Sequence, residues 1–209
     1  MKDIRQEFWE NPSVIKSFSE KLPSSYITNV LDEFIANVSF LKVLDIGCGT
    51  GRYSKYLKNR GVDVIALDKH KGMIQSLQDD KIPFILANMS TIPLPANTFD
   101  LILSIGVLHN AISMNELQSS ISEMSRLLKS NGFLLCSIFT DDLISEDLTV
   151  LGDGIFLILN QLPMILLPRD GIDELFLKRN LRKHSIIDEH ITDVGTGKRY
   201  VYTALFQKK

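Results

Sequence analysis

The sequence lacks most of the features that mark secreted or nucleic-acid-binding chains. It has only two cysteines in 209 residues, Cys48 in a glycine-rich stretch and Cys136 in a predicted strand. Two isolated thiols exclude a disulfide framework and a cysteine metal cluster, so we expect a protein of the reducing cytoplasm. The formal net charge is only -2. No excess of positive charge therefore calls for a nucleic acid or an anionic membrane as partner.

Long apolar runs are also missing. Residues 1–7 contain no apolar core of the kind that signal peptides have. The very apolar stretch 154–167 is interrupted by Asn160, Gln161 and Pro163. It falls short of the roughly 20 residues that a spanning helix needs, so we expect no membrane span. There is no internal repeat, low-complexity segment or linker, and a chain of 209 residues then predicts one domain.

Residues 43–51, which read V-L-D-I-G-C-G-T-G, form the most informative pattern. An apolar run ends at an acidic residue, glycines follow at alternate positions, and a helix-like stretch begins at Arg52. A strand, a glycine loop and a helix in this order allow backbone to approach a nucleoside cofactor closely. A dinucleotide fingerprint would have glycine where Arg52 stands, and this departure disfavours a nicotinamide-dependent oxidoreductase.

A second strand follows at about residues 62–67 and ends in Asp68. A carboxylate at a strand end, about 20 residues past a glycine loop, can accept hydrogen bonds from both hydroxyls of a ribose. The alternative is that Asp68 only caps the next helix. Its spacing from Gly47 favours the ribose interpretation.

The D-x-G-x-G-x-G pattern resembles motif I of the class I S-adenosylmethionine-dependent methyltransferases. Further stretches resemble that family in the expected order, at residues 84–89, 92–100, 101–110 and 127–135. The resemblance covers about residues 40–140 and implies an enzyme that transfers a methyl group from S-adenosylmethionine. It divides the single domain into an N-terminal helical cap, a cofactor-binding core, an insert and a C-terminal hairpin, at residues 1–39, 40–140, 141–182 and 183–209.

The pattern of apolar runs predicts an α/β fold in which strands alternate with helices. Strands are expected near residues 41–46, 62–67, 83–87, 99–105 and 132–139. Two more, near 184–193 and 199–207, are joined through a glycine-rich turn and predict an antiparallel hairpin. The resemblance implies a Rossmann-like, seven-stranded, mostly parallel sheet in the order 3-2-1-4-5-7-6, with helices on both faces.

The resemblance also implies which residues hold the cofactor. Gly47 and Gly49 would bring backbone close to its methionine part, Asp45 would support the ammonium group, and Asp68 would hold the ribose. Asn88 stands where the family usually has Asp, and its amide oxygen can accept a hydrogen bond from the adenine amino group. The other expected cofactor-binding residues are Cys48, Gly51, Arg52, Lys69, Met89 (through its backbone), Ser104 and Ile105. Arg52 is equally compatible with a solvated helix residue and with a partner for the cofactor carboxylate.

His109 is the candidate general base, because it follows the fourth strand at the ligand-binding end of the sheet. An imidazole near its ordinary pKa can remove a proton from a nucleophile at neutral pH. The alternative, which we favour slightly, is that His109 caps a helix or packs against its loop. His70, His184 and His190 are expected at the surface and show no metal-ligand spacing, so we expect no metal site.

Two segments outside the core could shape an acceptor pocket. The aromatic pair Phe8 and Trp9, joined by Tyr26, would form either a lid or ordinary core anchors. Residues 154–167 would form an acceptor lid, a homodimer interface or plain core.

The C-terminal third loosely resembles small tellurite-resistance-type methyltransferases, which implies a small-molecule acceptor. A wobble-uridine tRNA methyltransferase is the alternative, and the lack of basic excess argues against it. A non-catalytic sensor or activator that binds S-adenosylmethionine is a further alternative.

Overall fold

The computed structural model describes residues 4–39, 41–158, 162–195 and 197–209. The strands of the main sheet are β1 (Lys42–Ile46), β2 (Asp63–Asp68), β3 (Phe84–Leu86), β4 (Phe99–Ile105), β5 (Leu128–Thr140), β9 (Leu181–Asp193) and β10 (Lys198–Lys208). The helices are α1 (Ile4–Trp9), α2 (Pro12–Ser19), α3 (Ser25–Asn37), α4 (Arg52–Lys58), α5 (Lys71–Ile74), α6 (Met114–Leu127) and α7 (Arg169–Leu177), with short 3-10 turns η1 (Gln75–Leu77) and η2 (Leu108–Asn110).

The main sheet has seven strands in the order β3-β2-β1-β4-β5-β10-β9. The first five strands are parallel to one another, and β10 runs antiparallel to both β5 and β9. This is the predicted order, and the predicted C-terminal hairpin is confirmed. The carboxyl ends of the five parallel strands meet at one edge, where ligands bind in open α/β sheets.

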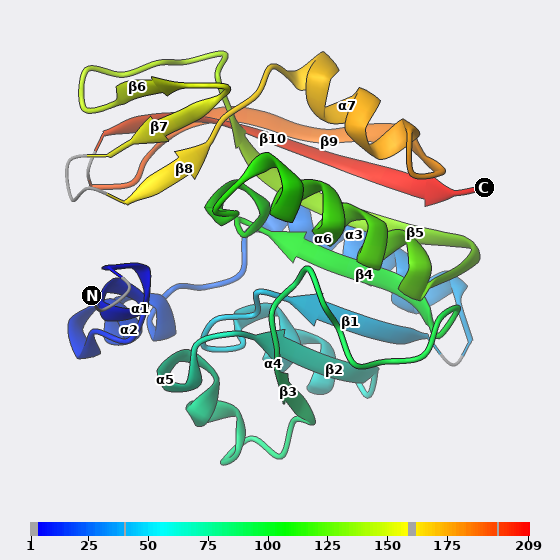
Figure 1. The fold of residues 1–209 in the computed structure, drawn as a ribbon. Helices are drawn as coiled ribbons and strands as arrows, with labels where there is room; N and C mark the ends of the chain where they lie inside the picture. The colour runs from blue at the N-terminus through cyan, green and yellow to red at the C-terminus, as the bar shows by residue number, and fades with distance from the viewer. Residues whose placement is uncertain (1–3, 40, 159–161, 196) are drawn as a thin grey trace.

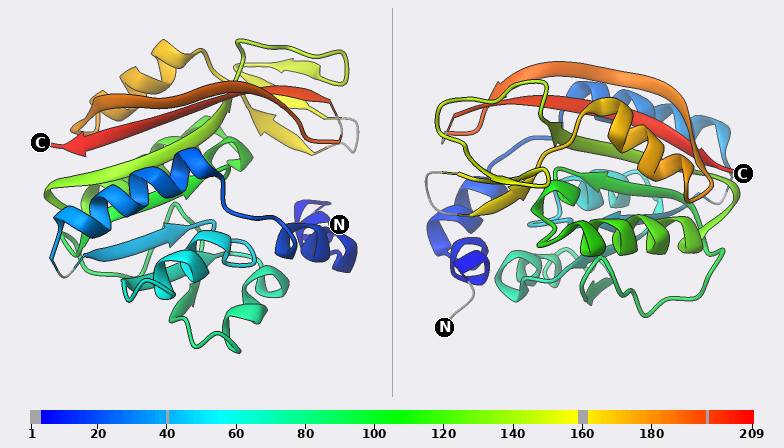
Figure 2. Two further views of the ribbon diagram at one scale, coloured as in Figure 1. Left: turned by 180° about the vertical axis from the view of Figure 1, so that it is seen from behind. Right: turned by 45° about the horizontal axis from the view of Figure 1, so that its top comes forward.

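Helices cover both faces of the sheet, so the core has two layers (Figures 1 and 2). On one face α6 and α7 bury an apolar cluster that includes Leu117, Ile121 and Phe176. On the other face α3, α4 and η1 bury a second cluster, with Leu31 and Leu57 in it. Burial on both faces explains why the parallel strands read as continuous apolar runs.

Helix α6 shows how local sequence fixes these layers. Ser113 is its N-cap, and the hydroxyl oxygen accepts a hydrogen bond of 3.1 Å from the backbone N–H of Glu116. Its buried residues recur every three or four positions, so one stripe faces the sheet. The first turn of α6 lies beside the loop that follows β3, because Nδ2 of Asn88 donates a hydrogen bond to Oε1 of Glu116.

The helices α1 and α2 stand apart from the sheet, near its ligand-binding edge (Figure 2, left). Asn11 caps α2 through its side chain, and Pro12 occupies the first helical position. At Gly72 in α5, an added Cβ would lie 3.0 Å from Cδ1 of Ile15 in α2. Glycine at this position therefore lets the N-terminal helices approach α5 closely.

The apolar segment 154–167 forms most of a small antiparallel sheet in the order β6 (Thr149–Gly152), β7 (Ile155–Leu157) and β8 (Pro163–Ile165). Phe156 and Met164 are cross-strand partners and are buried in a separate cluster, against which Phe8 of α1 packs. Residues 159–161, with the polar Asn160 and Gln161, lie outside the described residues. The small sheet and α1 thus meet beside the carboxyl ends of the parallel strands (Figure 1).

Candidate cofactor site

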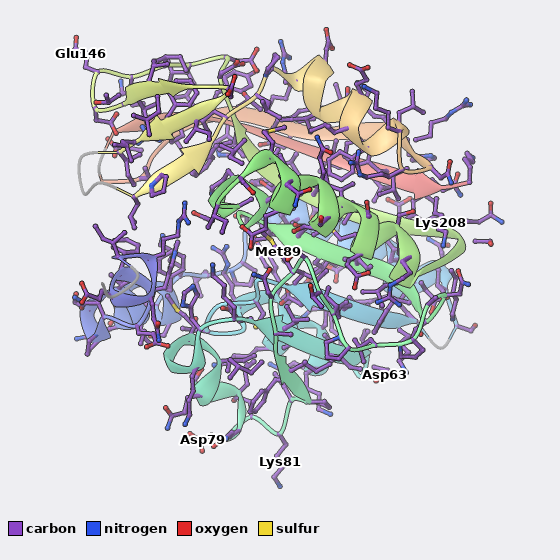
Figure 3. All side chains as sticks on the ribbon, in the orientation of Figure 1. Asp63, Asp79, Lys81, Met89, Glu146 and Lys208 are labelled. Carbon is purple, nitrogen blue, oxygen red and sulfur yellow. The ribbon has the colours of Figure 1, made fainter. Side chains whose placement is uncertain are left out.

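A cleft opens at the carboxyl ends of β1, β2, β3 and β4. Its lining residues come from α1 and from the loops after these strands: Trp9, Gly47, Leu67, Asp68, Lys69, His70, Ala87, Asn88, Met89, Gly106, Val107 and Asn110. In Figure 3, Met89 lies near the middle of the molecule, while Asp63, at the start of β2, marks the far end of that strand. Of the expected cofactor residues, Gly47, Asp68, Lys69, Asn88 and Met89 line this cleft.

Different effects disfavour a side chain at each of the three glycines of the loop, Gly47, Gly49 and Gly51. All three have positive φ, which side chains disfavour. A Cβ on Gly47 would lie 2.3 Å from Cγ2 of Val107, and one on Gly51 would lie 2.1 Å from Cδ2 of Leu77. A Cβ on Gly49 would meet no atom within 4 Å. Packing therefore disfavours side chains at the outer two glycines, while a Cβ on Gly49 would have open space around it.

Asp68 is buried, with 8% of its surface exposed, and its carboxylate is fixed by two backbone donors. Oδ2 accepts a 2.9 Å hydrogen bond from the N–H of Gly49, and Oδ1 accepts one of 2.9 Å from the N–H of His70. Because a carboxylate can accept about four hydrogen bonds, roughly two acceptor positions remain for a ligand. The Asp68 carboxylate is therefore held in a fixed orientation relative to the glycine loop.

Asp45 lies behind the loop rather than on the cleft wall. Its carboxylate is 2% exposed and accepts a 2.6 Å hydrogen bond from the hydroxyl of Ser54. Burial raises the pKa of Asp45 to about 6, against the opposing effect of the Ser54 hydrogen bond. Arg52 places its guanidinium over the ring of Tyr53, 4.7 Å from the centroid, and is likewise not a lining residue.

Cys48 is buried inside the loop, and its N–H donates to the carbonyl of Leu67 at 3.0 Å. Burial, reinforced by the carboxylate of Asp45, raises the pKa of the Cys48 thiol well above its ordinary value. The side chain is therefore a neutral thiol that contributes packing. Its backbone helps to hold the loop against the end of β2.

Asn88 is held by hydrogen bonds that differ from those the sequence predicts. Its amide oxygen accepts from both the N–H of Ser90, at 2.9 Å, and the hydroxyl of Ser90, at 3.0 Å. Its Nδ2 donates to Oε1 of Glu116 at 2.8 Å. With both lone pairs of the oxygen engaged, this geometry does not fit the expectation that the oxygen accepts from adenine.

The expected residues at the end of β4 lie behind the cleft. Ser104 is fully buried, and its hydroxyl has no hydrogen-bond partner among the described residues. Ile105 packs into the apolar cluster under α3 and α4. The next two residues, Gly106 and Val107, line the cleft in their place. The residues predicted to line the cleft after β4 are therefore about two positions away from those that do.

His109 lies in η2 and is not a lining residue, although the adjacent Asn110 is. Its ring stacks on Phe139, with centroids 4.2 Å apart, and Nδ1 accepts a 3.3 Å hydrogen bond from the N–H of Phe139. Burial, together with the charge of Arg199, lowers the pKa of His109 to about 3. An imidazole of such low basicity is a poor proton acceptor at neutral pH. The geometry favours the packing interpretation.

Two aromatic side chains outside the predicted set of cofactor-binding residues also line the cleft. Trp9 lines it from α1, with its ring centroid 6.3 Å from that of His70. His70 is buried, with 8% exposed, so the expectation that it lies at the surface is wrong. Tyr26 is not part of this group, since its ring contacts His190 at 5.6 Å. The Phe8–Trp9 pair was the only sequence signal that α1 contributes to the site.

Within the described residues, no group of three or more acidic, histidine or cysteine side chains could hold a metal ion. No helix in the described part of the chain is both long and apolar enough to cross a membrane. The cleft instead offers the positive-φ glycines Gly47 and Gly106 and the oriented carboxylate of Asp68, and the adjoining Gly49 has open space around a Cβ position. These features fit a nucleoside cofactor, and with the sheet they define a Rossmann-like nucleoside-binding protein.

Comparison with known proteins narrows the class of protein to which the chain is similar. A family model described as a methyltransferase domain matches residues 44–136. Malonyl-[acyl-carrier protein] O-methyltransferase of Salmonella typhimurium is 36% identical over 96 residues, which are 44% of this chain and 37% of that protein. An uncharacterized protein of Methanocaldococcus jannaschii is 33% identical over 159 residues, covering 71% of this chain and 66% of that protein. The tRNA (carboxymethyluridine(34)-5-O)-methyltransferase of Schizosaccharomyces pombe is 30% identical over 104 residues, which are 49% and 44% of the two chains. The chain thus spans less than two thirds of each of these relatives.

Solved structures share the fold over nearly the whole chain. The PH0226 protein of Pyrococcus horikoshii aligns with a TM-score of 0.72 and 20% identity, covering 96% of this chain and 93% of that one. The 1,6-didemethyltoxoflavin-N1-methyltransferase of Burkholderia thailandensis, with bound S-adenosylhomocysteine, aligns with a TM-score of 0.68 and 17% identity over 99% and 86% of the chains. The chain belongs to the class I S-adenosylmethionine-dependent methyltransferases.

Proposed function

We propose that this chain transfers the methyl group of S-adenosylmethionine to a small-molecule acceptor. The observation that carries the proposal is the fixed position of Asp68 beside Gly49, at the wall of a cleft that ends at Gly47 and Gly106. A ribose bound at Asp68 directs the rest of the cofactor along the carboxyl ends of neighbouring strands. The S-adenosylhomocysteine-bound Burkholderia structure supports this choice of cofactor by analogy of fold.

Residues at or behind the cleft would contact each part of the cofactor. Asp68 would accept from the ribose hydroxyls with its two remaining acceptor positions. The backbone at Gly47 and Gly106 would lie along the methionine part, because neither residue has a side chain to keep a ligand away. Asp45, buried behind the loop, would supply negative potential toward the ammonium group. Trp9 would cover the cleft from α1.

Bound S-adenosylmethionine supplies a methyl group already activated on a sulfonium. The chain therefore has to align the acceptor with the methyl carbon, exclude water and keep hold of the S-adenosylhomocysteine that leaves. Alignment alone lowers the barrier by about 7–11 kcal/mol. The uncharged, packed state of His109 agrees with a site that uses no imidazole base. A nucleophile that is already deprotonated, or that loses its proton to solvent, suits such a site.

Helix α1 and the small sheet would together cover the acceptor end of the cleft. Strand β8 lies against η2, whose Asn110 lines the cleft, and Phe8 packs against the apolar cluster of the small sheet. Because Trp9 is next to Phe8, the same short helix touches both the cofactor cleft and the small sheet. The segment 154–167 would thus cover the end of the cleft through its position, with Phe156 and Met164 as its own core.

Side-chain truncations test the covering role of α1 and the core role of Phe156 in the small sheet. Phe8→Ala should alter turnover or acceptor preference more than S-adenosylhomocysteine affinity, whereas Phe34→Ala, on the far side in α3, should change neither. Phe156→Ala should instead lower stability by about 2–5 kcal/mol, since it removes a buried ring. Melting temperature, calorimetry and methyl transfer on all three variants distinguish these results.

Sedimentation of the same variants tests the homodimer-interface interpretation of this segment. Unchanged methyl transfer by folded Phe8→Ala would remove the covering role.

A wobble-uridine tRNA acceptor is the second candidate, and the fission yeast relative favours it. The net charge of -2 favours a small molecule, because tRNA binding draws on a basic surface. A methyl-release assay with a metabolite panel in one arm and total tRNA in the other separates the two acceptors. Turnover of tRNA by the isolated chain, with none of the metabolites accepted, would replace the small-molecule proposal.

Cofactor binding can be followed directly, because Trp9 is the chain's single tryptophan and lines the cleft. Titration with S-adenosylhomocysteine should change the Trp9 emission with a saturable, micromolar curve. A chain that binds in this way but releases no methyl group to any acceptor would be a sensor rather than an enzyme. Absence of any binding would remove the proposal altogether.

A further inference from the structure

Asn110 lies at the end of the cleft that the proposed function gives to the methyl group, and this inference rests on that function. A ribose at Asp68 leaves the carboxyl ends of β1 and β4 for the methionine part, and the cleft residues there are Gly47, Gly106, Val107 and Asn110. Among these described residues, Asn110 alone has a polar side chain. Gly106 has positive φ, and a Cβ on it would meet no atom within 4 Å. A ligand can therefore approach the backbone beside Asn110 closely.

One hydrogen bond fixes the orientation of the Asn110 amide. Its Nδ2 donates to the carbonyl oxygen of Gly106, four residues earlier, at 3.3 Å. This contact assigns the nitrogen end of the amide, because an amide oxygen there would face another oxygen. The side chain makes no other hydrogen bond to a described residue, so Oδ1 keeps both acceptor positions and Nδ2 keeps one proton. The oxygen is thus the unengaged end of the amide.

The surroundings of Asn110 favour a nucleophile that needs no base. Asn110 ends η2, and β8 of the small sheet packs against this turn. The neighbouring His109 is stacked on Phe139 away from the cleft, and burial lowers the pKa of His109 to about 3. A hydroxyl requires a base to become a good nucleophile. A neutral amine does not, because its nitrogen has a lone pair for attack and a hydrogen to donate.

We propose that Oδ1 of Asn110 accepts a hydrogen bond from the nucleophilic nitrogen of a neutral amine acceptor and aligns it with the methyl carbon. The nitrogen–carbon bond forms as the carbon–sulfur bond breaks, and the electron pair of the broken bond stays on sulfur. Positive charge passes from sulfur to nitrogen, so the hydrogen bond to Oδ1 strengthens during transfer. The methylated ammonium then loses one proton to solvent. The acceptor class is therefore an amine, and the chain is an N-methyltransferase.

A binding test of this role needs no known acceptor. Two stable analogues of S-adenosylmethionine, with a tertiary amine in place of the sulfonium, carry a 2-aminoethyl arm or a propyl arm in place of the methyl group. The arms have equal numbers of heavy atoms, and only the aminoethyl arm can donate to Oδ1. Calorimetry gives the ratio of the two affinities. Asn110→Leu should lower the preference for the aminoethyl arm at least tenfold, because a hydrogen bond from a charged group is lost.

Asn110→Asp separates the acceptor role from a structural role. Both variants lose the Nδ2 donor to the carbonyl oxygen of Gly106, but only Asp keeps an acceptor oxygen. Asn110→Asp should therefore keep the wild-type preference to within about threefold or raise it. Asn37→Leu is the matched control, because Nδ2 of Asn37 also donates to a carbonyl oxygen four residues earlier, that of Glu33 in α3. It should keep the wild-type preference.

Turnover gives a second measurement. In a panel of amines, alcohols and thiols, only amines should be methylated, and Asn110→Leu should lower kcat at least tenfold while KM for S-adenosylmethionine changes less than about threefold. Methylation of an alcohol or thiol but of no amine would overturn the inference alone. So would an unchanged preference in Asn110→Leu, or equal losses in Asn110→Leu and Asn110→Asp. A wild type that binds neither analogue nor S-adenosylhomocysteine would overturn the proposed function as well.

Discussion

The carboxylate of Asp68 accepts a 2.9 Å hydrogen bond from the backbone N–H of Gly49, 19 residues earlier in the chain. This contact joins the end of β2 to the loop after β1, and a second bond from the N–H of His70 fixes the other oxygen. The group that would bind a ribose is therefore positioned by the loop that would lie against the rest of the cofactor. Preorganisation of this kind reduces the ordering cost of binding.

Replacing Asp68 by Ala should lower the affinity for S-adenosylhomocysteine at least tenfold. The variant loses a charged acceptor for the ribose hydroxyls, and each such hydrogen bond contributes about 1.5–3 kcal/mol. Asp63→Ala, at the exposed start of the same strand, is the control and should bind like wild type. Calorimetry measures both. Normal binding by a folded Asp68→Ala protein would remove the ribose assignment.

Gly49→Ala should greatly weaken cofactor binding, because its Cβ projects into the open space where the ligand would lie. Gly61 provides a matched control, since it also has positive φ and free space around a Cβ, but lies at the other end of α4. Both alanines should cost about 1–2 kcal/mol of stability for the left-handed backbone. Only Gly49→Ala should lose affinity by calorimetry. Equal affinities for the two variants would show that the loop does not approach the ligand.

Asp45 should make the protein less stable as pH rises. Its folded-state pKa of about 6 exceeds the ordinary 3.8, so its favourable contribution is complete below pH 3.8 and is lost as pH rises through about 6. Asp45→Asn should therefore be more stable than wild type at pH 7.5, by roughly 3 kcal/mol. Below pH 3.8 the two proteins should unfold alike. Denaturant unfolding at both pH values checks this, and equal stability at pH 7.5 would contradict it. If Asp45 also supports the ammonium group, the stabler variant should bind S-adenosylhomocysteine more weakly.

His109 should affect acid stability rather than catalysis. Its folded-state pKa of about 3 lies below the ordinary 6.5, so its contribution is present above pH 6.5 and is lost as pH falls toward 3. Asn at this position keeps an acceptor for the N–H of Phe139 without the titrating ring. His109→Asn should therefore unfold at lower pH than wild type. Its pH profile of methyl transfer should be unchanged, and loss of the acid-side limb of that profile would restore the general-base role.

The sheet could be predicted from the sequence because its signals are local and redundant. Continuous apolar runs identify the parallel strands, and the resemblance to class I methyltransferases implies their order. The C-terminal hairpin was predicted from the glycine-rich turn, although β9 begins at Leu181 rather than near 184. Strand ends are set by pairing across the sheet, which the strand's own sequence does not contain.

The details of the cleft depend on contacts between distant segments and could not be predicted in the same way. Asn88 and Glu116 are 28 residues apart, and only the fold brings the carboxylate to the amide. Trp9 and His70 meet because α1 and α2 dock on α5. The small sheet is a second example. The sequence of its apolar residues is compatible with a lid, an interface or core, and it does not show that β6, β7 and β8 pair with one another.

Calorimetric titration with S-adenosylhomocysteine and with NAD tests the central claim most directly. The open loop at Gly49 and the fixed carboxylate of Asp68 suit an adenosine bound at the strand ends, while Arg52 stands where a dinucleotide fingerprint would have its final glycine. We predict micromolar binding of S-adenosylhomocysteine and much weaker binding of NAD. Tight binding of NAD with no binding of S-adenosylhomocysteine would contradict the account.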